Sequence, residues 1–267
     1  MFNIRKYRYI NNSKVLIFIG SPRTGSTLLG QLINYHPQCL IANEYSLITK
    51  VVKNGKNYKR ELKKLYDIAL EQFNKGLENC NHFGKTINIY QPKWKNMSKL
   101  ARNTIFEKKD IRVIGDKKAG GTIKTFLNNK NEVINFFNKH SEIITIQILR
   151  HPIDAAKSYM KSHNISTFEE AINYIMLYTY EAYELSKMIN NKSILLYYED
   201  LISNSEDVLK SIFNDLNLDI SQEWLSEIVN VITKDKNQGT YTEKEIEIYM
   251  KLLNNFLENK ELFYKYQ

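Results

Sequence analysis

The chain has 267 residues, 43% of them hydrophobic, and carries a formal net charge of +9. This length suits one large α/β domain, and no stretch approaches the ~20 apolar residues that a membrane helix needs. The basic balance suits a polyanionic ligand, although a bias toward Lys, Asn, Ile and Tyr explains the charge equally well, and no Lys/Arg block is dense enough to indicate nucleic acid.

The first predicted element is a buried strand at residues 14–19, where an apolar run of strand length ends in Gly20. Residues 25–35 then have helical spacing, and Pro37 ends that helix. Strands alternate with helices further along, so we expect an α/β fold with a mostly parallel sheet and a ligand site beyond the carboxyl ends of the strands. The remaining predicted strands are 111–115, 142–149 and 193–198, and the remaining helices are 59–72, 131–139, one opening at Pro152, 169–189, 206–216, 222–232 and 243 to about 264.

The loop at residues 20–27, Gly-Ser-Pro-Arg-Thr-Gly-Ser-Thr, lies between a strand and a helix. Its backbone N–H groups and the helix N-terminus predict a phosphate cradle. The spacing matches a P-loop, but Ser26 stands where a nucleoside triphosphatase has its lysine. A cation is present earlier, at Arg23, where it would lie over a transferring group.

The stretch VLIFIGSPRTGSTLLGQLINYHP resembles the 5′-phosphosulfate loop of sulfotransferases that use 3′-phosphoadenosine-5′-phosphosulfate (PAPS). Its arginine form is similar to the tyrosylprotein sulfotransferases and to bacterial relatives. The resemblance implies a three-layer P-loop-type parallel sheet flanked by helices, with extra helices forming the acceptor side and no metal. The residues it assigns to the 5′-phosphosulfate are Arg23, Thr24, Gly25, Ser26 and Thr27.

A second motif follows the strand that ends at Leu149. Arg150 with Ser158, eight residues later, resembles the family's 3′-phosphate motif, and a guanidinium with a hydroxyl suits a phosphate monoester. Tyr198, in Tyr-Glu-Asp, matches the tyrosine that helps to hold the adenine, although a half-buried strand-end aromatic is an equal reading. Residues 234–241 lie where the family has a loop over the 3′-phosphate, which makes Lys236 and Gly239 weak candidates.

The predicted catalytic base is a carboxylate. Glu44 has the spacing from Arg23 that the tyrosylprotein enzymes have between loop arginine and base, and its pKa would have to be raised for this role. A helix-start carboxylate is the alternative reading of Glu44. Lys117, in Gly-Asp-Lys, is expected to contact the sulfuryl group or the leaving oxygen, in preference to Lys118. The chain departs from the family's Gly-Asp-Lys-Thr-Pro after Lys117, which leaves the direction of that lysine open.

The sequence therefore predicts one sulfotransferase domain over residues 1–267, which moves a sulfuryl group from PAPS to an acceptor hydroxyl on a saccharide, lipid, peptide or small alcohol. Two alternatives stay open: a P-loop kinase or nucleotide-binding protein, and a non-catalytic PAPS-binding module. Cys39 and Cys80 predict neither a disulfide framework nor a zinc site. Val15–Ile19 is too short for a signal-peptide core, so we expect a cytoplasmic protein without a transmembrane segment and without a nucleic-acid partner.

Overall fold

The structure is a computed structural model that describes residues 10–75, 81, 82, 85, 86, 108, 110–232, 239–254, 256, 262 and 266. Its centre is a five-stranded sheet with the strand order β2-β5-β1-β6-β7, in which every neighbouring pair is parallel. The strands are β1 (Lys14–Ile19), β2 (Cys39–Asn43), β5 (Val113–Lys117), β6 (Ile143–Leu149) and β7 (Ser193–Tyr197). A separate antiparallel pair joins β3 (Asn81–His82) to β4 (Lys85–Thr86).

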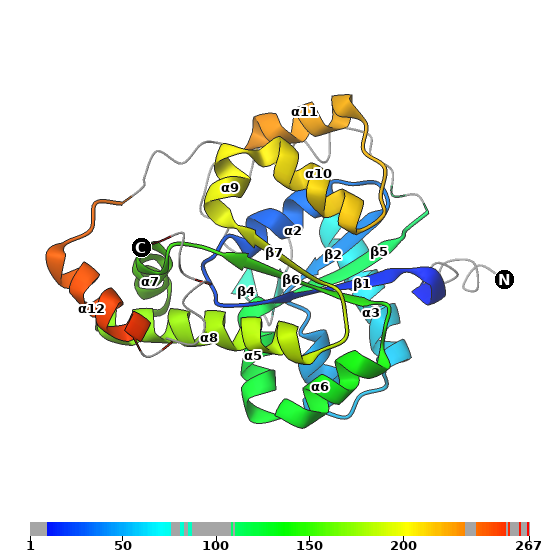
Figure 1. The fold of residues 1–267 in the computed structure, drawn as a ribbon. Coiled ribbons are helices and arrows are strands. Elements are labelled where there is room, and N and C mark those ends of the chain that lie inside the picture. The colour runs from blue at the N-terminus through cyan, green and yellow to red at the C-terminus, as the bar shows by residue number, and fades with distance from the viewer. Residues whose placement is uncertain are drawn as a thin grey trace.

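Helices cover both faces of the sheet, which confirms the predicted three-layer α/β fold (Figure 1). One face packs against α2, α9, α10 and α11, and the other against α3, α5, α6 and α8. The alternation along β1 explains this, because Leu16 and Phe18 belong to the first core and Val15, Ile17 and Ile19 to the second. The helices are α2 (Ser26–Asn34), α3 (Tyr58–Lys75), α5 (Ala119–Asn128), α6 (Lys130–Lys139), α7 (Pro152–His163), α8 (Phe168–Met188), α9 (Tyr198–Ser203), α10 (Ser205–Asp215), α11 (Gln222–Val231) and α12 (Glu243–Leu253).

Two short helical turns complete the described elements, a 3-10 turn at Ile10–Asn12 and a π-helical turn at Thr49–Lys53. A third apolar core joins α7, α8 and α12, so the last long helix packs beside the helix that follows β6. Within the described part of the chain, no helix combines the length and the apolar character needed to cross a bilayer.

Several predicted boundaries differ from the structure. β5 runs from Val113 to Lys117 and not over 111–115, because Asp116 and Lys117 continue the pairing with β1 and β2. Tyr198 begins α9 and does not end β7. The prediction for the last helix extends past Leu253 into residues of which only a few are described. The sequence reading missed β2 and α5.

Candidate active site

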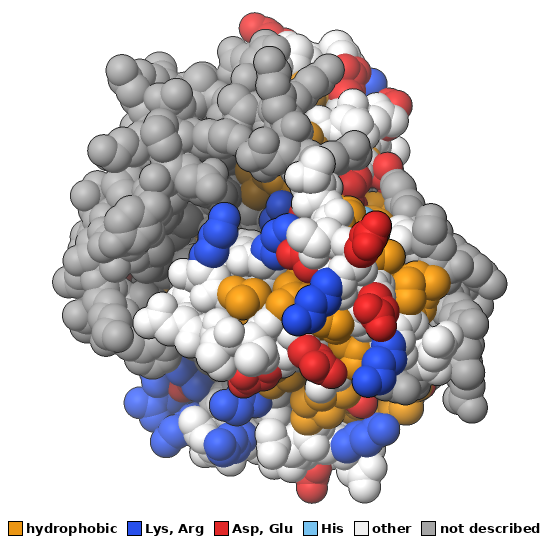
Figure 2. Space-filling view, turned by 90° about the vertical axis from the view of Figure 1, so that its left-hand side faces the viewer, with side chains coloured by type: hydrophobic (Ala, Val, Ile, Leu, Met, Phe, Trp, Pro, Cys, Tyr) orange, Lys and Arg blue, Asp and Glu red, His pale blue; other side chains and the backbone are white. Residues whose placement is uncertain are grey.

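All five strands of the sheet end at the same edge, because all run parallel. This edge carries the loops that follow β1, β2, β5, β6 and β7. Figure 2 views the molecule from the side toward which the strands of Figure 1 point, and basic and acidic side chains are intermixed on that face.

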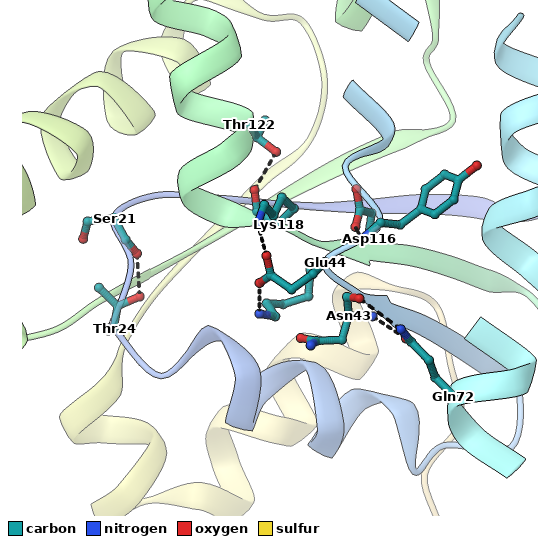
Figure 3. Close-up of polar contacts among 10 residues, drawn as sticks. Ser21, Thr24, Asn43, Glu44, Gln72, Asp116, Lys118 and Thr122 are labelled. Atoms are coloured by element: carbon teal, nitrogen blue, oxygen red, sulfur yellow. Dashed lines mark hydrogen bonds and ion pairs between the residues drawn. The ribbon is translucent and has the colours of Figure 1, made fainter. Parts of the chain in front are cut away.

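The loop after β1 has the backbone of an anion cradle. Gly20 has φ 128°, Arg23 has φ 68° and Gly25 has φ 96°, so three positions of the loop have positive φ. Helix α2 begins directly after Gly25, and no side chain caps its first N–H groups. The Thr24 hydroxyl donates to the Ser21 carbonyl at 3.2 Å, which closes the turn (Figure 3). The loop therefore directs uncapped N–H groups toward the edge of the sheet, as phosphate binding requires.

Tyr198 joins this loop to the one after β6. A Cβ atom added to Gly25 would lie 2.4 Å from Cδ2 of the Tyr198 ring, so only glycine leaves room for the ring there. Arg150 is a second neighbour of this ring: its Cζ atom lies 4.6 Å from the ring centre, within the range of a cation–π contact. The predicted adenine-contacting tyrosine thus packs against both predicted phosphate-binding loops.

Arg23 lies beside Arg150 and Ser158, although it is more than a hundred residues from either of them in sequence. Nε of Arg23 donates to Oγ of Ser158 at 3.0 Å, and Nη1 of Arg150 donates to the Arg23 carbonyl at 3.3 Å. Burial, followed by the charge of Arg150, lowers the pKa of Arg23. Among the described residues, no carboxylate forms an ion pair with either arginine, and the buried Nε of Arg150 has no hydrogen-bond partner. Two adjacent cations that form no ion pair within the described part of the chain favour a bound anion.

Glu44 follows β2 and has φ 64°. Its carboxylate lies between two lysines, since Oε1 contacts the Nζ atom of Lys117 and Oε2 contacts that of Lys118 (Figure 3). Burial acts to raise the pKa of Glu44, but the two lysines outweigh it and hold the pKa below its usual range. The raised pKa that the base role was predicted to require is therefore not found. The structure instead presents a carboxylate that is ionised at neutral pH.

Asp116 holds the Glu44 loop in place, a role that sequence reasoning missed. The residue is 1% exposed, and its two side-chain oxygens accept the N–H groups of Tyr45 at 3.0 Å and Leu47 at 2.6 Å. These bonds stabilise a loop in which both Glu44 and Ser46 have positive φ. Burial raises the pKa of Asp116 to about 6 despite these hydrogen bonds. Its place before Lys117, in Gly-Asp-Lys, is the only feature of the sequence that could have indicated this role.

Helix α3 closes the edge of the sheet beside Glu44. The N–H of Asn43 donates to Oε1 of Gln72 at 2.7 Å, and Nε2 of Gln72 donates to the Asn43 carbonyl at 3.1 Å (Figure 3). The Gln72 amide therefore makes the two hydrogen bonds that a neighbouring strand would otherwise make to Asn43, the last residue of β2. The helix predicted at 59–72 therefore holds Asn43, the residue that precedes the predicted base, in addition to packing against the sheet.

The loop after β6 is covered by a segment near the C-terminal end of the described chain. The ring of Tyr241 stacks on His151 with ring centres 4.6 Å apart, and its hydroxyl donates to Oδ2 of Asp154 at 3.1 Å. The N–H of His151 donates to Oε1 of Glu199 at 2.9 Å, which joins this loop to the start of α9. Gly239 lies against Asp154, whereas Lys236 lies outside the described residues.

The predicted residues form two groups at one edge. Arg23, Arg150, Ser158 and Tyr198 make the first, beside Thr24 and Gly25 of the cradle and the opening residues Ser26 and Thr27 of α2. Glu44 and Lys117 make the second, together with Lys118. The start of α5 connects the two, because a Cβ atom on Gly120 would lie 3.5 Å from Cδ of Pro22 in the cradle.

Comparison with known proteins assigns the family. The sequence model of the sulfotransferase family matches residues 16–222. Among solved structures, the sulfotransferase STF9 from Mycobacterium avium is 11% identical with a TM-score of 0.51, over 96% of this chain and 80% of that one. The mouse sulfotransferase SULT7A1, complexed with PAP, is 12% identical with a TM-score of 0.51, over 95% and 89% of the two chains. A comparison with curated proteins found no match. The two structures share the fold, the family match spans both groups of site residues, and the chain belongs to the sulfotransferase family.

Proposed function

We propose that the chain transfers a sulfuryl group from PAPS to an acceptor hydroxyl. The observation that carries the choice of donor is the pair of neighbouring arginines: Arg23 donates to Ser158, Arg150 donates to the Arg23 carbonyl, and neither has a carboxylate partner among the described residues. PAPS has a 3′-phosphate in addition to its 5′-phosphosulfate, and two neighbouring guanidiniums fit such a distribution of charge. The mouse relative was solved in complex with PAP, the desulfated form of this donor.

In this proposal each group of site residues contacts a different part of the donor or acceptor. The cradle from Arg23 to Thr27 holds the 5′-phosphosulfate, Arg150 and Ser158 hold the 3′-phosphate, and Tyr198 contacts the adenine. Glu44 takes the acceptor proton, while Arg23 and Lys117 stabilise charge on the group in transfer. PAPS supplies the sulfuryl group and a phosphate leaving group. For transfer to occur in line, the acceptor must approach from the side of Glu44, opposite the leaving oxygen.

The lowered pKa of Glu44 is compatible with this role. A carboxylate that is ionised at neutral pH is ready to accept a proton without prior deprotonation, although its driving force for proton transfer is smaller. The two lysines that lower the pKa of Glu44 contact its carboxylate. In this proposal their positive charge also stabilises the negative charge that develops on the sulfuryl group, which compensates for the smaller driving force for proton transfer.

The test compares donor binding with transfer. We expect titration calorimetry to show that PAP binds and that ATP with Mg²⁺ binds more weakly, and labelled PAPS to transfer its sulfur to an acceptor in extracts of the source cell. Glu44→Gln should reduce the transfer rate by ~10²–10⁴-fold and leave PAP affinity unchanged, because general-base catalysis contributes that much. Glu132→Gln, an exposed position on α6, is the matched control and should change neither.

The outcomes separate the alternatives. Preferential binding of ATP with Mg²⁺ would favour a P-loop kinase. PAP binding without transfer to any acceptor would favour a binding module. Undiminished transfer by the Glu44→Gln variant would show that Glu44 is not the base.

A further inference from the structure

Lys117 and Lys118 contact the same carboxylate but are held differently. Lys117 is the last residue of β5, its side chain is 8% exposed, and its stem lies against Gly30 of α2. Lys118 follows the strand, precedes the first turn of α5, and is 31% exposed. One ammonium is therefore fixed by the sheet, whereas the other rests on Glu44 from the more open side.

Gly121 makes the contact of Lys118 possible. A Cβ atom at this position would lie 2.6 Å from Cγ and 2.9 Å from Cε of Lys118, so the lysine stem lies directly over the glycine. Gly121 does not have a positive φ, which means that space and not backbone conformation requires glycine here. The Lys118 side chain can consequently fold back over the start of α5 and reach Glu44, as Figure 3 shows.

We propose that Lys118 is a positioning residue that occupies Oε2 of Glu44 until the acceptor hydroxyl displaces it, while Lys117 stays on Oε1. This inference rests on the proposed sulfotransferase function. Oε2 is then the oxygen that takes the acceptor proton. Gly121 contributes to the same arrangement, because the absence of a side chain there leaves room for the Lys118 side chain.

The step balances without a further reactant. The acceptor oxygen forms a bond to sulfur as its proton passes to Oε2, and the bond between sulfur and the 5′-phosphate oxygen breaks with its electron pair on that oxygen. Lys118 takes no part in the proton transfer. Among the residues that the structure describes, the charged groups that act on Glu44 are Lys117 and Asp116 from β5 and Lys118 from the cap of α5. Removal of Lys118 from Oε2 therefore leaves Glu44 with one cation and one neighbouring acid, and it raises the proton affinity of the base at the moment when a proton is transferred.

The pairing can be tested without any acceptor. The Glu44 carboxyl can be titrated by carbon NMR in protein labelled at glutamate, with Glu44→Gln to assign the resonance. Lys118→Met should raise the pKa of Glu44 by about one unit, because an opposite charge at contact lowers a carboxyl pKa by one or more. Lys118→Arg should restore the wild-type value, and Lys124→Met, an exposed lysine on the same helix, should leave it unchanged. An unchanged Glu44 pKa in Lys118→Met would overturn the proposal.

A second variant separates the position of Lys118 from the loss of its charge. Gly121→Ala keeps Lys118 and suits the helix, but its methyl group displaces the lysine stem. It should raise the Glu44 pKa in the same direction as Lys118→Met, while unfolding of the protein by urea shows that α5 is intact. A wild-type titration curve in Gly121→Ala would contradict the role of the glycine.

Displacement itself is tested by single-turnover transfer from labelled PAPS to the acceptor identified in the assay above. The pH profile of kcat/KM reports the free enzyme and that of the saturated rate reports the complex. In the wild type, the acid limb of the saturated rate should lie at higher pH than that of kcat/KM, whereas in Lys118→Met the two limbs should coincide. Coincident limbs in the wild type would overturn displacement. If no transfer occurs at all, the proposed function fails and displacement with it, while the NMR titration still decides the ion pair.

Discussion

Asp116 is the residue on which the geometry around Glu44 depends. Positive φ costs a residue other than glycine roughly 1–2 kcal/mol, and the loop after β2 contains two such residues, Glu44 and Ser46. The buried carboxylate offsets this cost by accepting the N–H groups of Tyr45 and Leu47. Because Asp116 directly precedes Lys117, one strand end both holds the base loop and carries the cation that pairs with the base.

Asp116→Ala should therefore lower the free energy of unfolding at pH 7 by about 1–3 kcal/mol for each N–H group left without a partner. Its effect should also depend on pH. The folded-state pKa of about 6 lies above the unfolded value, so the folded protein binds the proton more tightly. The advantage of the wild type over Asp116→Ala should be largest below about pH 4 and should shrink as pH rises toward 6.

Urea denaturation of both proteins across this pH range measures the difference. Asp207→Ala, which removes an exposed carboxylate from α10, should show no such trend. A difference between wild type and Asp116→Ala that stays constant with pH would show that the Asp116 pKa is not raised in the folded protein.

At the scale of elements, the cradle after β1 and the start of α9 are packed against one another without spare space. Gly25 has φ 96° and faces the ring of Tyr198, so both its backbone and its surroundings require glycine. Gly55 offers a matched comparison, because it also has a positive φ of 61° but nothing lies within 4 Å of its absent Cβ.

We expect Gly25→Ala to destabilise the protein by about 1–3 kcal/mol more than Gly55→Ala, since overpacking adds to the backbone strain that both share. Thermal or urea unfolding measures the difference, and Gly25→Ala should also lose PAP binding. Tyr198→Ala in the Gly25→Ala background should recover part of the stability. Equal destabilisation by the two glycine variants would show that the ring does not press on the cradle.

At the scale of the whole molecule, a segment near the C-terminus packs against the loop that follows β6. Helix α12 packs with α7 and α8 in the third apolar core, and this packing brings Tyr241 onto His151 and Asp154. His151 and Asp154 lie between Arg150 and Ser158 in sequence. The packing of the C-terminal region therefore contributes to the position of the predicted 3′-phosphate site.

Tyr241→Ala should weaken PAP binding by up to about tenfold, because an aromatic stack contributes about 0.5–1.5 kcal/mol. Tyr241→Phe keeps the stack and removes only the hydrogen bond to Asp154, so it should have the smaller effect. Titration calorimetry with PAP compares the two. The same loss of affinity in both variants would assign the contribution to the hydrogen bond instead.

The sequence alone determined the local parts of this protein. The apolar run of β1, the glycine spacing of the cradle and the position of Arg150 after β6 are each set by consecutive residues, so their patterns predicted the α/β fold and the family. The short edge strand β2 was missed because it has no period of its own and is completed by pairing with β5 and Gln72. Helix α5 was missed because Gly120 and Gly121 favour a turn, and close approach to Pro22 and Lys118 explains both glycines.

Only the tertiary structure decided how the side chains meet. The contact of Arg23 with Ser158, the pairing of Glu44 with Lys118 and the hydrogen bonds of Asp116 join residues 69 to 135 positions apart. A parallel sheet brings these strand ends to one edge, but neither the twist of a loop nor the direction of a lysine follows from sequence spacing. The charge on Glu44 illustrates this, because nothing next to it in sequence indicates the two lysines, Lys117 and Lys118, that lower its pKa in the folded protein.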